Sequence, residues 1–95
     1  MKLIGKSILD EFKQKHADAR LQIDSWEAEV KEAEWKTPQD IKNRYPKASI
    51  LSKQRVVFNI CGNKYRLLTL VTYKTGVVFV KKIGTHNEYD NWIID

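Results

Sequence analysis

The chain has 95 residues, of which 42% are hydrophobic and 11% aromatic, so we expect a single folded domain over residues 1–95 with a modest core. The single cysteine excludes an internal disulfide, and charged residues near the N-terminus, Lys6, Asp10 and Glu11, exclude a secretory signal. The sequence contains no apolar run long enough for a membrane span. Together these features predict a cytoplasmic location. The net charge is +5, and residues 41–87 hold ten Lys or Arg but no Asp or Glu, which favours a polyanionic partner, although a solvated basic surface is the alternative.

Helical periodicity dominates the first half of the chain. After a short strand at Leu3 and Ile4, a Ser7 cap predicts a helix to about residue 17, with its buried face formed by Ile8, Leu9 and Phe12. A second helix is predicted over about residues 19–34 from the spacing of Ile23, Trp26, Val30 and Ala33. A third helix should begin after a Thr37 cap and stop before Pro46, followed by a brief strand at residues 49–51.

Three consecutive strands follow from Arg55, with turns predicted at residues 62–63 and 75–76. If the first turn has two residues, Asn59 faces Arg66, and the opposite face is apolar and packs on the first two helices through Val56, Phe58, Ile60, Tyr65 and Leu67. If the second turn also has two residues, Leu70 faces Lys81, and Asn59, Arg66 and Thr85 form a row. A shift of one residue would disperse this row.

A short terminal helix is predicted from the capping-box pattern of Thr85 and Glu88. His86 would lie in its first turn, where the helix dipole disfavours an imidazolium while Asp90 favours one, and the sequence leaves this balance open. Tyr89 would lie one turn from His86 on the same side. The end of the chain is expected to be anchored by Trp92, Ile93 and Ile94.

These polar residues have the chemistry that RNA cleavage by an adjacent 2′-hydroxyl requires: a base, cations for the phosphorane, and an acid for the leaving oxygen. Phosphate can be bound by Arg55, Lys64 and Arg66, whereas His86 can transfer a proton and Tyr89 can stack on a base or donate a proton. The chain has no metal-ligand cluster and no nucleotide-binding loop, so no metal or cofactor is expected. The same residues are explained equally well as a structural histidine among basic side chains scattered over the surface.

The segment RVVFNICGNKYRL and the later segment IGTHNEYD together resemble the HigB group of bacterial toxins, in the wider RelE/ParE-like superfamily. The upstream segment WKTPQDIKNRYPKASIL is also similar, so the resemblance covers nearly the whole chain. It implies an α+β, RelE-like fold with N-terminal helices on one face of a curved, mainly antiparallel sheet and a short C-terminal helix.

The resemblance also implies a function. It predicts an mRNA interferase, a metal-independent endoribonuclease that cuts mRNA on the 70S ribosome, inhibits translation and growth, and needs no cofactor. The implied partner is a HigA-type antitoxin with a helix-turn-helix domain. The toxin would contact DNA only as part of its complex with this antitoxin. The residues that match the motif as catalytic are Lys64, Arg66, His86 and Tyr89, without an assignment of acid and base. The residues expected to bind RNA are Lys53, Arg55, Asn59 and Lys81.

Two other functions remain open from the sequence. A basic domain of this size can bind RNA or an acidic protein without catalysis, and strongly salt-dependent binding would be its signature. Some members of the superfamily, of the ParE type, inhibit gyrase instead of cutting RNA.

Overall fold

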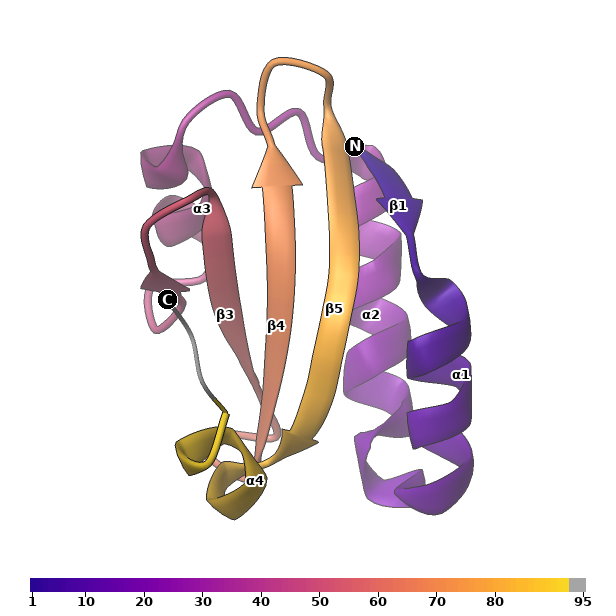
Figure 1. Ribbon diagram of the computed structural model, residues 1–95. Helices are drawn as coiled ribbons and strands as arrows, with labels where there is room; N and C mark the ends of the chain where they lie inside the picture. The colour runs from indigo at the N-terminus through magenta and orange to yellow at the C-terminus, as the bar shows by residue number, and fades with distance from the viewer. Residues whose placement is uncertain (93–95) are drawn as a thin grey trace.

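The computed structural model describes residues 1–92, in which a five-stranded mixed sheet is covered on one face by helices (Figure 1). The strand order is β1-β5-β4-β3-β2, with β1 parallel to β5 and every other pair antiparallel. The elements in chain order are β1 (Lys2–Ile4), α1 (Lys6–Lys15), the 3₁₀ helix η1 (Ala17–Ala19), α2 (Arg20–Glu32), α3 (Pro38–Arg44), β2 (Ser49–Ile50), β3 (Arg55–Ile60), β4 (Tyr65–Thr72), β5 (Val77–Thr85) and α4 (His86–Asp90). The expected α+β class is therefore confirmed.

The start of α1 differs from the prediction. The N-cap is Gly5, with a φ of 93°, and no side chain caps the helix, so the predicted Ser7 cap is wrong. The chain has to turn sharply from β1 into α1 against the neighbouring strand, where a Cβ on Gly5 would stand 2.8 Å from the carbonyl oxygen of Val80. Tertiary contact with β5 thus determines where the helix begins.

The start of α3 agrees with the prediction. The Thr37 hydroxyl accepts a hydrogen bond from the Asp40 N–H at 3.3 Å, and the Asp40 carboxylate accepts one from the Thr37 N–H at 3.1 Å. Pro38 occupies the first turn, and Tyr45, directly before Pro46, terminates the helix. The short strand β2 follows and pairs with β3 through Ser49–Val57 and Ile50–Val56.

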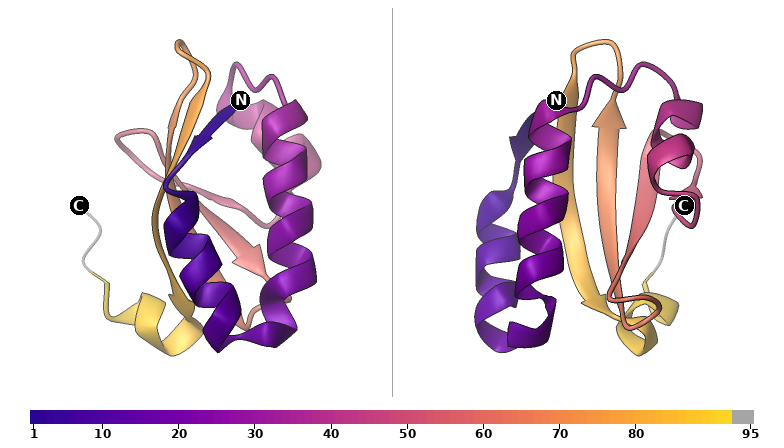
Figure 2. Two further views of the ribbon diagram at one scale, coloured as in Figure 1. Left: turned by 90° about the vertical axis from the view of Figure 1, so that its right-hand side faces the viewer. Right: turned by 180° about the vertical axis from the view of Figure 1, so that it is seen from behind.

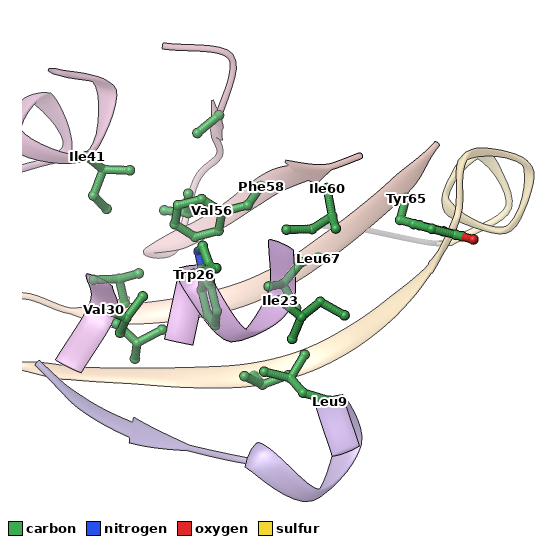
Figure 3. Close-up of a cluster of buried hydrophobic side chains, with 14 of the residues drawn as sticks. Leu9, Ile23, Trp26, Val30, Ile41, Val56, Phe58, Ile60, Tyr65 and Leu67 are labelled. Atoms are coloured by element: carbon green, nitrogen blue, oxygen red, sulfur yellow. The ribbon is translucent and has the colours of Figure 1, made fainter. Parts of the chain in front are cut away.

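The hydrophobic core lies between the helices and one face of the sheet (Figure 3). As predicted, this face carries apolar side chains that are buried, namely Val56, Phe58, Ile60, Tyr65 and Leu67. They pack with Leu9 of α1 and with Ile23, Trp26 and Val30 of α2. Trp26 and Trp35 are 2% and 7% exposed, so both tryptophans belong to the core. Burial of this apolar surface fixes the sheet orientation, because a one-residue slip would expose it.

Of the two hairpin registers predicted from the sequence, that of β3 with β4 is correct and that of β4 with β5 is wrong. The β3–β4 register is as expected, since Asn59 pairs with Arg66. The β4–β5 register is not: Leu70 pairs with Phe79 instead of Lys81, and Arg66 pairs with Gly84 instead of Thr85. The connecting loop spans residues 73–76, and a bulge opposite Leu68 and Thr69 inserts Lys81 as an extra residue. The predicted row of Asn59, Arg66 and Thr85 is therefore wrong, because Gly84 and not Thr85 pairs with Arg66 on β5.

The sheet face opposite α1 and α2, called the open face below, carries Arg55, Val57, Asn59, Arg66, Leu68, Leu70, Phe79 and Lys82. Helix α4 lies at one end of the sheet and away from α1 and α2 (Figure 2). Trp92, after α4, approaches Gly84 so closely that an added Cβ would lie 3.1 Å from its ring. The predicted anchoring by Ile93 and Ile94 falls outside the described residues. Among residues 1–92, no helix is both long and apolar enough to cross a membrane.

Candidate active site beside the terminal helix

Helix α4 is held against the end of the sheet by its first residues. The Thr85 hydroxyl accepts from the Glu88 N–H at 3.2 Å, and the Glu88 carboxylate accepts from the Thr85 N–H at 2.9 Å. The backbone hydrogen bond that Glu88 receives lowers the pKa of its carboxyl group. The His86 N–H donates to the Lys64 carbonyl oxygen at 3.0 Å, which joins the helix to the β3–β4 turn. The predicted capping box is confirmed, and it fixes the position of His86 and Tyr89.

Arg66 and Tyr89 come together at this end of the open face. The guanidinium carbon of Arg66 lies 5.7 Å from the centroid of the Tyr89 ring, within the range of a cation–π contact. The same guanidinium donates to the carbonyl oxygen of Asn63 at 3.0 Å. Tyr89 in turn meets Trp92 edge to face, with ring centroids 5.6 Å apart. A cation that can bind phosphate therefore lies beside two aromatic rings on which a base can stack.

His86 lies on α4 one turn before the end of that helix. Its Nδ1 is 3.6 Å from Asp90 Oδ1, and its side chain is 51% exposed. This separation exceeds hydrogen-bond distance, so the contact is a loose one between two solvated groups. An accessible imidazole is suited to exchanging a proton with a substrate near neutral pH.

Lys64 extends toward the helical layer. Its ammonium group lies 2.5 Å from Asp18 Oδ2, and the Tyr65 hydroxyl donates to Asp18 Oδ1 at 2.9 Å. The hydrogen bond to Asp18 raises the pKa of Lys64, and the hydrogen bond from Lys64 lowers the pKa of Asp18. Both effects favour the charged form of each partner in this ion pair. His16 Nδ1 lies 3.3 Å from the Tyr65 hydroxyl and completes this polar group.

The other predicted RNA contacts are spread along the sheet. Asn59 pairs directly with Arg66. Arg55, four residues away on the same strand and about 13 Å along it, donates to the Ser52 carbonyl oxygen at 3.0 Å. Lys53 lies in the β2–β3 connection with a φ of 58°, and the Lys81 ammonium stands 5.6 Å from the Phe79 ring centroid. The structure therefore brings Asn59, Arg66 and Tyr89 into one cluster and leaves Arg55, Lys53 and Lys81 outside it.

Sequence reasoning missed three residues that contact the predicted site or the adjoining Trp92. Asp18 is the ion-pair partner of Lys64, Asn63 binds Arg66, and the Lys82 ammonium lies 5.7 Å from the Trp92 ring centroid. The β5 bulge, which placed Lys82 opposite Leu68, leaves no local sequence signal. Asp18 lies 46 residues before Lys64 in the sequence, and no local signal connects the two residues.

Within residues 1–92, no three His, Cys, Asp or Glu side chains gather in a way that could hold a metal ion. The four predicted catalytic residues supply a guanidinium and a phenol, which lie together at Arg66 and Tyr89, an imidazole on the same short helix as Tyr89, and an ammonium held by Asp18. Together these groups can neutralise a charged phosphate, transfer a proton and stack on a base.

Comparisons with known proteins identify the class to which this fold and cluster belong. A family model described as HigB_toxin, the RelE-like toxic component of a toxin–antitoxin system, matches residues 19–92. The protein is thus a RelE-like toxin.

More narrowly, the chain belongs to the HigB toxin family. It is 23% identical over 92 residues to the mRNA interferase toxin HigB of Escherichia coli (strain K12), a match that covers 95% of this chain and 88% of the relative. The mRNA interferases HigB of Escherichia coli O157:H7 and Shigella flexneri match with the same identity and coverage. Membership of this family also means that the protein has an antitoxin partner.

Proposed function

We propose that this HigB-type toxin is an mRNA interferase whose active site is formed by Arg66, His86 and Tyr89, with Lys64 as a further cation. At family level the function is that of an endoribonuclease that inhibits translation, and the relatives carry that name. The observation that carries the site assignment is the Arg66 guanidinium, 5.7 Å from the Tyr89 ring, on an open face next to the helix that bears His86.

Each residue has a role that its surroundings support. Arg66 donates to the non-bridging oxygens of the phosphorane, because its guanidinium is held by Asn63 beside the Tyr89 ring. Tyr89 and Trp92 stack on the bases that flank the cut. His86 exchanges the proton with either the 2′-hydroxyl or the leaving 5′-oxygen. The chemistry is an attack of the 2′-oxygen on phosphorus with departure of the 5′-oxygen.

Lys64 acts as a permanent positive charge in this proposal. The hydrogen bond to Asp18 raises its pKa, which favours the charged form that stabilises anionic phosphate. Arg55 and Asn59 on the open face, together with Lys81 at the β5 bulge, bind the RNA backbone, and Lys53 extends this contact beyond the sheet. The absence of acidic residues between positions 41 and 87 supports this assignment, because no carboxylate in that segment repels the RNA.

The substrate is mRNA on the 70S ribosome in this proposal, and the neutralising partner is a HigA-type antitoxin with a helix-turn-helix domain. Through that antitoxin the complex would reach DNA. The location that follows is the cytoplasm, where translating ribosomes are found.

The test is induced expression in a bacterial host, with the wild type beside Arg66→Ala and His86→Ala and mapping of new mRNA 5′ ends. We expect growth arrest with fresh cuts inside translated frames, lost in both variants. Lys74→Ala, in the loop at the far end of β4 and β5, is the matched control and should still cut. Circular dichroism of the purified variants must show a folded protein, since unfolding would remove the support for catalysis.

Other outcomes would point to the other functions. Growth arrest with intact mRNA and induction of DNA damage would assign gyrase inhibition. Salt-dependent RNA binding without cleavage, even with ribosomes present, would assign a non-catalytic binding module.

A further inference from the structure

The bulge in β5 decides which side chains of that strand reach the open face. Val80 lies in the core, so regular alternation along the strand would turn Lys82 and Gly84 toward the core as well. The bulge inserts Lys81 as an extra residue, and Lys82 then pairs with Leu68 of the open face. Bulges occur frequently beside active sites, where they redirect a side chain. In this protein the bulge brings Lys82 and Gly84 to the same face as the proposed active site.

Lys82 lies close to Arg66 on that face. Arg66 pairs with Gly84, so Lys82, two residues earlier on β5, is its diagonal neighbour, and such neighbours are about 7–8 Å apart. Lys82 is exposed, and among residues 1–92 no carboxylate lies within ion-pair distance of its ammonium group. Lys64, by contrast, is paired with Asp18. A phosphate group can therefore bind Lys82 without displacing an acid of the described chain.

Trp92 lies against the strand at Gly84. A Cβ on Gly84 would stand 3.1 Å from the Trp92 ring, so this position accepts the ring only because it has no side chain. The Trp92 N–H donates to the Tyr89 carbonyl oxygen at 3.0 Å, and the two rings meet edge to face with their centroids 5.6 Å apart. The Lys82 ammonium lies 5.7 Å from the centroid of the Trp92 ring. Backbone and side-chain contacts thus hold Trp92 beside Lys82.

These contacts form a row of two cations and two aromatic rings. At one end, the guanidinium carbon of Arg66 lies 5.7 Å from the Tyr89 ring centroid. At the other end, Lys82 contacts Trp92. A single RNA strand presents phosphates and bases in alternation, and proteins bind such strands with cationic groups for the backbone and aromatic rings for the bases. The row therefore provides one cation and one ring for each of two successive nucleotides.

We propose that Lys82 and Trp92 form a second nucleotide-binding subsite, which holds a nucleotide of the RNA strand next to the one at the cut. Trp92 stacks on the base, and the Lys82 ammonium leaves the ring to bind the phosphate, because a cation–π contact at an exposed site is weak. Both residues position the strand and take no part in proton transfer. The inference rests on the proposed function, since it takes RNA as the substrate, and it adds Lys82 and Gly84 to the residues that substrate binding requires.

RNA fits this subsite better than an acidic protein segment does. An acidic segment would pair with the Lys82 ammonium but would leave the neighbouring rings without a matching partner, whereas every base has a flat face that stacks on them. The strand that carries Lys82 contains no Asp or Glu that would repel phosphate. The nearby Glu88 carboxylate is engaged at the start of α4, where it accepts from the Thr85 N–H at 2.9 Å.

The test is the binding of a short 2′-O-methyl oligoadenylate to the full toxin, because a strand without a free 2′-hydroxyl cannot be cut by the proposed route. Lys82→Gln should weaken binding about threefold to tenfold and reduce the slope of its salt dependence by roughly 0.7, the value for one phosphate contact on a single strand. Lys74→Gln, in the loop at the far end of β4 and β5, is the matched control and should leave the slope unchanged.

Two further variants test the ring. Trp92→Leu should weaken binding about fivefold or more with an unchanged salt slope, because it removes stacking and no charge. Gly84→Ala should have the same effect, since the added Cβ displaces the Trp92 ring and the backbone at this position has no positive φ to disfavour alanine. Circular dichroism of each variant must match the wild type.

An unchanged salt slope in Lys82→Gln, or equal losses in Lys82→Gln and Lys74→Gln, would overturn the proposal. Normal oligonucleotide binding with slower cleavage on ribosomes would also overturn it, because Lys82 would then contact the ribosome. Weaker binding of the antitoxin alone would assign Lys82 to that partner instead. Lys82-dependent binding of the oligonucleotide by a wild-type protein that cuts no mRNA would support the subsite and refute the proposed function alone.

Discussion

The ammonium group of Lys64 lies 2.5 Å from the carboxylate of Asp18, so a cation expected to act on RNA is bound to an acid of the helical layer. The Tyr65 hydroxyl holds the same carboxylate at 2.9 Å and limits the positions that Asp18 can adopt. The pair joins the β3–β4 turn to η1 and places a negative charge close to the candidate site. The negative charge of Asp18 should repel RNA and weaken its binding.

Asp18→Asn should therefore strengthen RNA binding. The substitution removes the competing anion but keeps an oxygen that can accept from Tyr65 and contact Lys64. We expect an affinity gain of about threefold and a salt dependence steeper by roughly one phosphate contact. The measurement is the dissociation constant of a single-stranded RNA across a salt series. Asp24→Asn, an exposed acid on α2, serves as the control and should leave both values unchanged. An unaltered salt slope in Asp18→Asn would show that Lys64 does not contact phosphate.

The Lys64–Asp18 ion pair should contribute to stability across the whole neutral pH range. The pKa of Asp18 lies below its ordinary value of 3.8, so its contribution to stability is complete above about pH 5 and is lost as the pH falls through that lowered pKa. The pKa of Lys64 lies above its ordinary value of 10.5, so its contribution is complete below about pH 9 and is lost as the pH rises through that raised pKa. The pair is thus ionised throughout the neutral range.

His86→Gln tests proton transfer directly, because it removes the imidazole and keeps a polar side chain. We expect its single-turnover cleavage to be slower than that of the wild type by about 10²–10⁴-fold. A wild-type rate in the folded variant would assign proton transfer to another group. Thermal unfolding of both proteins separates changes of chemistry from changes of stability.

Gly5→Ala should destabilise the protein more than Gly76→Ala. Both glycines have a positive φ, 93° and 71°, but a Cβ at Gly5 would lie 2.8 Å from the Val80 carbonyl oxygen, whereas nothing lies within 4 Å at Gly76. The backbone cost alone is about 1–2 kcal/mol, and we expect about 1 kcal/mol at Gly76 and at least 2 kcal/mol at Gly5. Urea unfolding gives both free energies of unfolding. Equal losses would show that the Gly5–Val80 contact is relieved by a small backbone movement.

The sequence predicted most elements of the fold, because the signals that define them are local. Hydrophobic spacing placed α1 and α2, Thr37 and Pro38 fixed the start of α3, and Thr85 with Glu88 fixed the start of α4. The β3–β4 register was also predictable, since a tight turn between two apolar runs leaves few pairings. The family resemblance of the motifs around Arg66 and His86 was confirmed by the match over residues 19–92.

Tertiary structure decided the features that depend on contacts between distant segments. The predicted β4–β5 register was wrong because a longer loop and a bulge at Lys81 shift the pairing. The sequence contains no local pattern that would predict this backbone geometry. The predicted Ser7 cap was wrong because the close approach of β5 requires Gly5 at the turn from β1 into α1. Asp18 lies 46 residues from Lys64 in the chain, so only the packing of η1 against the β3–β4 turn could bring the two charges together. Sequence alone therefore determined which elements form, whereas long-range packing determined which charged groups meet.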